Sequence, residues 1–239
     1  MKQKNYFLSF FVVCLFLIGT AKAQFKFGLG GGYSGVFGSE NYNDKFPTHG
    51  LTSDLEFGYL IKDHVEPGLR LGFNYQANPN ATKTSNRVGD MDFPNLYNLT
   101  VMPYLRYYFL ESVAFRPYLV GAFGYSYNST DIITYSQPIL GNANLDYKAS
   151  GFGGRLGAGV RLIKFLDLSL SYAYLGNLKR EFTAAGGVGQ NIPETTEDLF
   201  NASGGDVYKN KYHLHALELQ LNFVFGGNLK KKDKKDKVE

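Results

Sequence analysis

The chain has 239 residues, of which 44% are hydrophobic and 16% aromatic, with one cysteine and a formal net charge of +4. This length fits a single domain of the barrel or sandwich type. A lone cysteine excludes an internal disulfide framework. The excess positive charge lies in the first 23 and the last ten residues and leaves the body between them slightly acidic, so the composition excludes nucleic-acid binding through a basic surface.

Residues 1–23 have the organisation of a signal peptide. Early lysines precede an apolar run from residue 6 to 18, and an Ala-Lys-Ala sequence that signal peptidase can cleave ends at residue 23. The run is too short for a membrane-spanning helix, which needs about 20 apolar residues. Cys14 is followed by further apolar residues, which argues against a lipid anchor. We therefore expect the mature chain to begin at Gln24.

Eight later segments alternate apolar residues with polar or small ones at period two, the pattern of a strand with two different faces. In one of them, Leu166, Leu168 and Leu170 alternate with Asp167 and Ser169. The segments are 25–36, 51–61, 65–77, 97–109, 117–127, 150–162, 166–175 and 212–225.

The connections between these segments alternate in length. Short ones lie at 62–64, 110–116 and 163–165, and long ones, rich in Gly, Asn, Ser, Thr and Asp, at 38–50, 78–96, 128–149 and 176–211. Outer-membrane barrels have an even number of antiparallel strands, short periplasmic turns and long external loops. The sequence thus predicts an all-β fold, an eight-stranded antiparallel up-and-down transmembrane β-barrel over 24–226, and a Lys-rich periplasmic tail over 227–239.

The orientation of the two strand faces decides between a membrane barrel and a soluble, lipocalin-like barrel, whose apolar face points inward. A narrow membrane barrel needs small residues and a few long polar ones inside. The glycine-rich faces of 25–36 and 150–162 meet this need, and Tyr and Phe recur toward the strand ends, as in interfacial aromatic girdles. This favours a membrane barrel, with the soluble barrel as the alternative.

Four stretches carry a resemblance to a known family: VMPYLRYYF at 101–109, RPYLVG at 116–121, GGRLGAGV at 153–160 and the closing strand 217–225. In these the chain resembles the small outer-membrane β-barrel proteins, similar to the OmpA membrane domain, OmpX and PorT-like barrel domains. The resemblance implies export to the Gram-negative outer membrane, contact with its lipid and insertion by the barrel-assembly machinery, but no activity. Many relatives end on an aromatic residue, whereas fourteen residues follow Phe225 here.

Three patterns resemble ligand motifs: a glycine-rich stretch at 30–35, the pair His213 and His215, and the triplet Asn142, Asn144 and Asp146. The glycines lie within a strand instead of before a helix, the histidines lack a third ligand, and the triplet lacks the glycine and bidentate Glu of a calcium loop. No Ser, His and acid combination suggests a nucleophile and its base. We therefore expect no enzyme activity, cofactor or metal.

Charged residues on the predicted inward face form the most specific pattern. Charges in a low-dielectric interior are retained mainly when they are paired. Symmetric short turns set Glu56 opposite Arg70 and Arg161 opposite Asp167. The predicted lumen charges are Asp54, Glu56, Glu66, Arg70, Arg106, Arg155, Arg161, Asp167 and Glu218.

These features support two main hypotheses of function. In the first, the protein has a structural or surface-interaction role, its lumen is plugged by the paired charges, and its long loops contact an extracellular partner. In the alternative, it is a narrow pore or small-ligand channel in which the same charges select solutes. A third, an enzyme at the membrane rim, lacks a catalytic arrangement, and no hypothesis involves nucleic acid.

We predict that the longest loop, 176–211, is mobile and lies outside the cell, because it is rich in Gly, Thr, Asn and acidic residues. Protease added to intact cells should cleave the chain within this loop. Protection in intact cells, with cleavage only after lysis, would reverse the predicted topology.

Overall fold

The structure is a computed structural model that describes residues 24–39, 42, 46–61, 63–78, 84–85, 95–110, 115–137, 141–184 and 210–226. The predicted signal peptide 1–23, the tail 227–239 and the middle of several predicted loops lie outside the described residues. The strands are β1 (Gln24–Gly38), β2 (His49–Leu60), β3 (Val65–Ala77), β4 (Thr84–Ser85), β5 (Asn95–Tyr108), β6 (Arg116–Thr130), β7 (Ile133–Gln137), β8 (Gly141–Ile163), β9 (Leu166–Ala184) and β10 (Lys211–Gly226).

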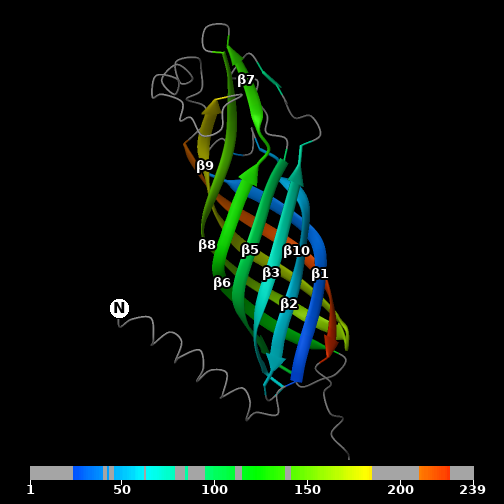
Figure 1. Ribbon diagram of the computed structural model, residues 1–239. Coiled ribbons are helices and arrows are strands. Elements are labelled where there is room, and N and C mark those ends of the chain that lie inside the picture. The colour runs from blue at the N-terminus through cyan, green and yellow to red at the C-terminus, as the bar shows by residue number, and fades with distance from the viewer. Residues whose placement is uncertain are drawn as a thin grey trace, which may run out of the picture.

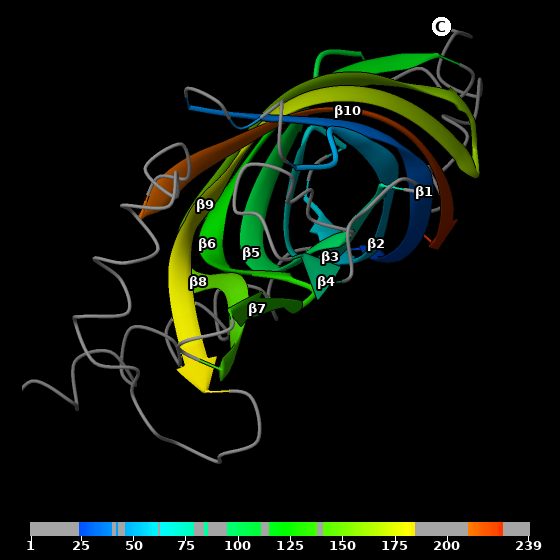
Figure 2. The same cartoon turned by 90° about the horizontal axis from the view of Figure 1, so that it is seen from above.

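Eight of the strands form a closed antiparallel barrel in the order β1, β2, β3, β5, β6, β8, β9 and β10, and pairing of β10 with β1 closes the ring (Figure 1). Figure 2 shows this ring from above. The short strands β7 and β4 lie outside it, attached through β8. The predicted fold class and strand count are therefore confirmed.

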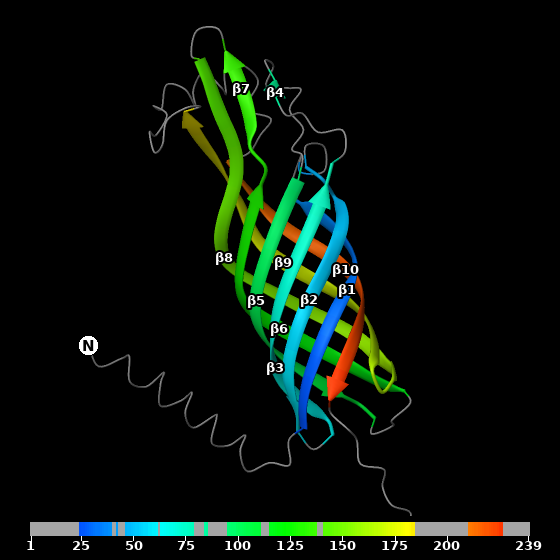
Figure 3. The same cartoon turned by 45° about the vertical axis from the view of Figure 1, so that its right-hand side comes forward.

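Short turns and long connections lie at opposite ends of the barrel. The turns β2–β3, β5–β6 and β8–β9 share one end with the two termini of the barrel, since Lys26 of β1 pairs with Gly226 of β10. We call this the turn end. The four long connections lie at the other end, the loop end, where the short strand β7 and the ends of β8 and β9 project beyond the ring (Figure 3).

Two predicted loops contain more strand than the sequence pattern indicated. Segment 128–149 was expected to be a loop, but β6 continues to Thr130 and is followed by β7 and the first residues of β8. Likewise, β9 continues past residue 176 to Ala184, and its register with β8 resumes with Lys148 opposite Lys179. Both segments are rich in Gly, Asn, Ser and Thr, which the sequence pattern assigns to loops, yet Leu145, Tyr147 and Leu178 are buried there on the inward face.

The apolar side chains point outward and the polar ones inward. Phe152 is 81% exposed and Phe123 is 69% exposed, whereas Arg106 is only 1% exposed. A soluble protein rarely displays so large an apolar surface. The soluble, lipocalin-like alternative is therefore excluded. Within the described residues, no helix has the length and apolar character needed to cross a membrane.

We predict that Gly159→Ala destabilises the barrel, because a Cβ atom at this position would lie 2.5 Å from the Tyr118 ring and 2.7 Å from the Leu168 carbonyl oxygen. Such overpacking costs about 1–3 kcal/mol. The matched control is Gly121→Ala, whose Cβ would meet nothing within 4 Å. Urea unfolding in detergent, followed by gel mobility, should show a lower midpoint for the first variant alone. Equal midpoints would contradict close packing inside the barrel.

Candidate functional site

All nine predicted lumen charges lie inside the barrel, and none is more than 5% exposed. Their positions follow from strand geometry, because alternate residues of a strand point to the same face. The strands that supply them are β2, β3, β5, β8, β9 and β10. Together with Lys26 of β1, which is 2% exposed, we call these residues the charged layer.

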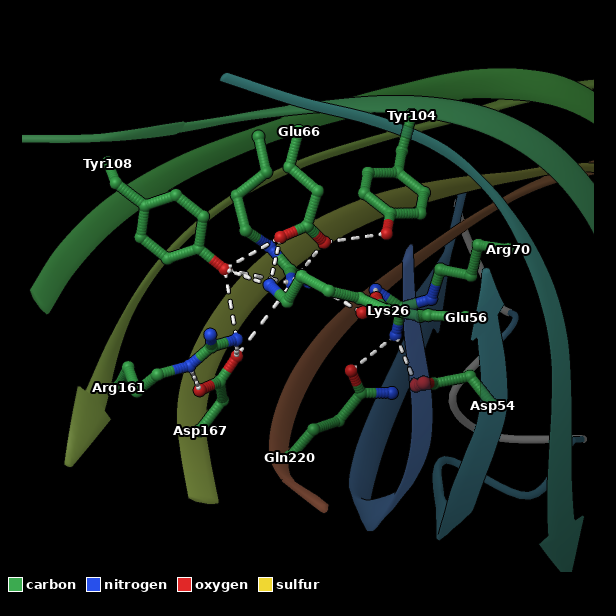
Figure 4. A network of polar contacts seen from close by, with 11 residues as sticks. Lys26, Asp54, Glu56, Glu66, Arg70, Tyr104, Tyr108, Arg161, Asp167 and Gln220 are labelled. Carbon is green, nitrogen blue, oxygen red and sulfur yellow. Dashed lines mark hydrogen bonds and ion pairs between the residues drawn. The ribbon is translucent and has the colours of Figure 1, made fainter. Parts of the chain in front are cut away.

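Glu66 is the most highly connected carboxylate of the charged layer (Figure 4). Its Oε1 atom accepts hydrogen bonds from Arg106 at 3.0 Å and from the Tyr104 hydroxyl at 2.8 Å. Its Oε2 atom accepts one from Tyr108 at 2.9 Å and forms an ion pair with Lys26. These contacts join β3 to β5 beside it and to β1, which lies on the far side of β2.

Arg106 continues the ion pairs across the lumen to Glu56, at 2.6 Å. The predicted register of Glu56 opposite Arg70 is present, with 3.3 Å between Arg70 Nη1 and Glu56 Oε1. Arg70 makes its hydrogen bonds elsewhere, however, to Asp54 and Gln220. The expected Glu56–Arg70 pair is thus one link in a longer chain of charges rather than an isolated contact.

Two further ion pairs are bidentate. Arg161 lies opposite Asp167, as the short turn predicted, with contacts of 2.6 and 2.9 Å. Arg155 of β8 reaches across β9 to Glu218 of β10, with 2.9 Å between Nη2 and Oε1. Planar guanidinium and carboxylate groups favour this paired geometry.

Two further buried cations, Lys26 and Arg116, were not among the predicted lumen charges. Lys26 lies on the glycine-rich face of β1, which is the inward face, so its position in the alternation could have identified it. Arg116 lies just before the predicted strand 117–127. It donates to the carbonyl oxygens of Leu110, at 2.9 Å, and Asp63, and so ties two turns together at the turn end.

Toward the loop end, most of the buried side chains are uncharged. Next to the charged layer lie Asn74, Asn98, Ser126 and Asn128, which we call the amide layer. Asn98 donates hydrogen bonds to Ser126 and Asn128, each at 2.8 Å, and accepts one from Asn74 at 3.0 Å. Beyond it, Phe46 contacts Tyr42, Tyr147 and Tyr212, with ring centroids 4.9 to 5.1 Å apart. This apolar layer consists of Val36, Tyr42, Phe46, Leu96, Ile133, Leu145, Tyr147, Ala173, Leu175, Leu178, Tyr212, Leu214 and Ala216.

The histidines lie on the outer surface near the loop end. His215 Nδ1 is 2.6 Å from the Tyr172 hydroxyl, and His213 Nδ1 is 3.4 Å from the Tyr174 hydroxyl. Asp146, from the calcium-like triplet, instead faces Lys148 at 3.6 Å. Among the described residues, no group of three or more His, Cys, Asp and Glu side chains could hold a metal ion.

Comparisons with known proteins agree with this architecture. A family model described as the outer membrane protein beta-barrel domain matches residues 9–225. A comparison with curated proteins gave no match. Among solved structures, a major outer membrane protein from Thermus thermophilus is 15% identical, with a TM-score of 0.50 and coverage of 85% of this chain and 99% of that one.

Two further structural matches are more distant in shape. Neisserial surface protein A is 16% identical, with a TM-score of 0.45 over 84% of this chain and 97% of that one. The outer membrane enzyme PagL is 10% identical, with a TM-score of 0.36 over 82% of this chain and 97% of that one. At such identities a likeness indicates the fold alone and specifies no activity.

We predict different outcomes when the charges of two ion pairs are exchanged. Removing either partner of a dry pair costs about 3–5 kcal/mol. Arg155→Glu with Glu218→Arg should recover most of that loss, because these groups mainly bind each other. Glu56→Arg with Arg70→Glu should recover little, because the new arginine would face Arg106 and the new glutamate would face Asp54. Urea unfolding measures the stability of both double variants. Equal recovery would mean that the Glu56–Arg70 pair is not coupled to Arg106 and Asp54.

Proposed function

Because the chain belongs to the outer membrane protein β-barrel domain family, we propose that it is an outer-membrane protein with a structural or surface-interaction role and a lumen closed by its own side chains. The observation that carries this proposal is the balance and burial of the charged layer. It contains five carboxylates and five cations, all buried: Asp54, Glu56, Glu66, Asp167 and Glu218 with Lys26, Arg70, Arg106, Arg155 and Arg161.

This balance supports a plug over a selective channel. A pore that selects ions commonly displays a ring of charges of one sign to the permeating solute. Here each carboxylate is within ion-pair distance of a cation, and several bridge strands that are not neighbours in the barrel. Charges neutralised by one another in this way attract a permeating ion less than a ring of one sign would.

The apolar layer supports the same proposal from the loop end. Its residues come from the barrel strands, from Ile133 of β7, and from Tyr42 and Phe46, which lie between β1 and β2. Phe46 packs against Tyr147 and Tyr212, and Tyr42 packs against Tyr212. An apolar constriction opposes the passage of water and ions because their hydration is lost there. Two layers of different chemistry then close one lumen.

One observation favours the alternative of a narrow pore. Several buried polar atoms of the described residues lack a hydrogen-bond partner, among them Asp54 Oδ1, Arg70 Nε, Arg155 Nε and Asn222 Oδ1. Buried polar atoms of this kind usually bind water. A continuous file of such waters would make the lumen a pore, whereas separate waters would leave it closed.

The role that we propose is non-catalytic, and the partner is a molecule outside the cell that contacts the long loops. The barrel-assembly machinery would insert the chain into outer-membrane lipid after residues 1–23 are removed. The mature protein then begins at Gln24, with the tail 227–239 in the periplasm. N-terminal sequencing of protein isolated from the outer membrane tests the cleavage, and a sequence starting at Met1 would reject it.

We predict that the protein shows no unitary conductance steps in planar lipid bilayers. Opening only one layer, by Glu66→Ala with Arg106→Ala or by Phe46→Ala with Tyr212→Ala, should leave the lumen closed by the other. All four changes together should produce conductance, provided that heat-dependent gel migration shows a folded barrel. An outward substitution, Leu156→Ala, serves as the control for reconstitution. Steps in the unaltered protein would reject the plug and favour the pore.

A further inference from the structure

Three lysines form a row across neighbouring strands at the loop end. Lys148 of β8 is the register partner of Lys179 of β9, and Lys179 is the register partner of Lys211 of β10. All three lie on the outer surface, with Lys179 and Lys211 exposed and Lys148 partly covered. The row therefore faces the surroundings of the barrel and not its lumen.

The three lysines differ in how their charges are neutralised. Lys148 Nζ lies 2.6 Å from Glu181 and 3.6 Å from Asp146, and its hydrogen bond to Glu181 raises the pKa of Lys148. Within the described residues, no carboxylate lies within ion-pair distance of Lys179 or Lys211. Like charges directly opposite each other on adjacent strands destabilise the pairing. An anion bound between Lys179 and Lys211 would remove this repulsion.

The surface below the row changes from polar to apolar toward the barrel wall. Next to the lysines lie His213 and Asn177, which are register partners, then His215 with Tyr174. Beyond these, Leu217 and Leu219 are half exposed, as lipid-facing residues are. Aromatic residues with a polar tip mark the boundary between the hydrocarbon and the headgroups. The lysine row lies just outside this boundary, at the depth of lipid headgroups.

We propose that Lys179 and Lys211 bind the phosphate group of a phosphorylated lipid in the external leaflet. A lysine supplies a full positive charge and up to three donors on a flexible stem that can lie along the barrel wall. A bound phosphate neutralises Lys179 and Lys211 as Glu181 neutralises Lys148. The histidine and tyrosine side chains below then contact the apolar part of the same lipid.

This inference depends on the outer-membrane location of the barrel and is independent of whether the lumen is plugged. A conducting protein could bind the lipid, and a closed one could fail to do so. Lipid binding and bilayer conductance therefore test different statements.

The test measures binding of lipid A to the folded, full-length mature protein in detergent by native mass spectrometry. Lipid A with two phosphates should bind about tenfold more tightly than its dephosphorylated form, because charged contacts to the headgroup are lost in the latter. Lys179→Gln with Lys211→Gln should abolish this difference. Lys148→Gln, the matched control from the same row, should preserve it, as should Lys179→Arg with Lys211→Arg.

Several results would overturn the proposal. Undiminished preference for phosphorylated lipid A in the double glutamine variant would remove the lysines from the site, and an equal loss in Lys148→Gln would show attraction by overall charge. Competition by inorganic phosphate at concentrations near those of the lipid would indicate a site for a soluble anion. All variants are compared only as folded barrels, judged by heat-dependent gel migration, and their exposed positions leave the packing of the lumen unchanged.

Discussion

The structure depends on the requirement that every backbone N–H and C=O group inside a membrane has a hydrogen-bond partner within the protein. A β-sheet meets this requirement only when it closes, and here the first and last strands, β1 and β10, pair over most of their length. Closure with eight strands leaves a lumen just wide enough for side chains. The alternating pattern of the sequence then fixes which side chains meet lipid and which ones crowd together inside.

Crowding explains why glycines and long charged residues share the inward face. Gly58 lies against Tyr104 and Glu66, and Gly159 lies against Tyr118, so the absence of a side chain on one strand makes room for a large one on another. Charges carried across the lumen in this way meet partners on strands two positions away. Part of the charged layer therefore depends on the stagger of strands two positions apart, whereas Arg161–Asp167 lies within one hairpin.

The difference between contacts within one hairpin and contacts across an intervening strand explains how much of the interior could be predicted from the sequence. Glu56 opposite Arg70 and Arg161 opposite Asp167 lie in hairpins with short turns, so counting from the turn gives their register. The contacts of Lys26 with Glu66 and of Arg155 with Glu218 cross an intervening strand, and they depend on the stagger of the closed ring, which no local pattern specifies. The strand residues within 128–149 and 176–184 were missed because both predicted loops are rich in Gly, Asn, Ser and Thr.

The contacts of the charged layer also bear on how the barrel is assembled. Lys26 is near the start of β1, and its carboxylate partner Glu66 is on β3, whereas Glu218 is on β10, the last barrel strand in chain order among the described residues. A shift of one residue in any strand would turn its charges toward lipid. The ion pairs that cross an intervening strand require the correct stagger, so a barrel with one shifted strand would lack them and would expose its charges to lipid.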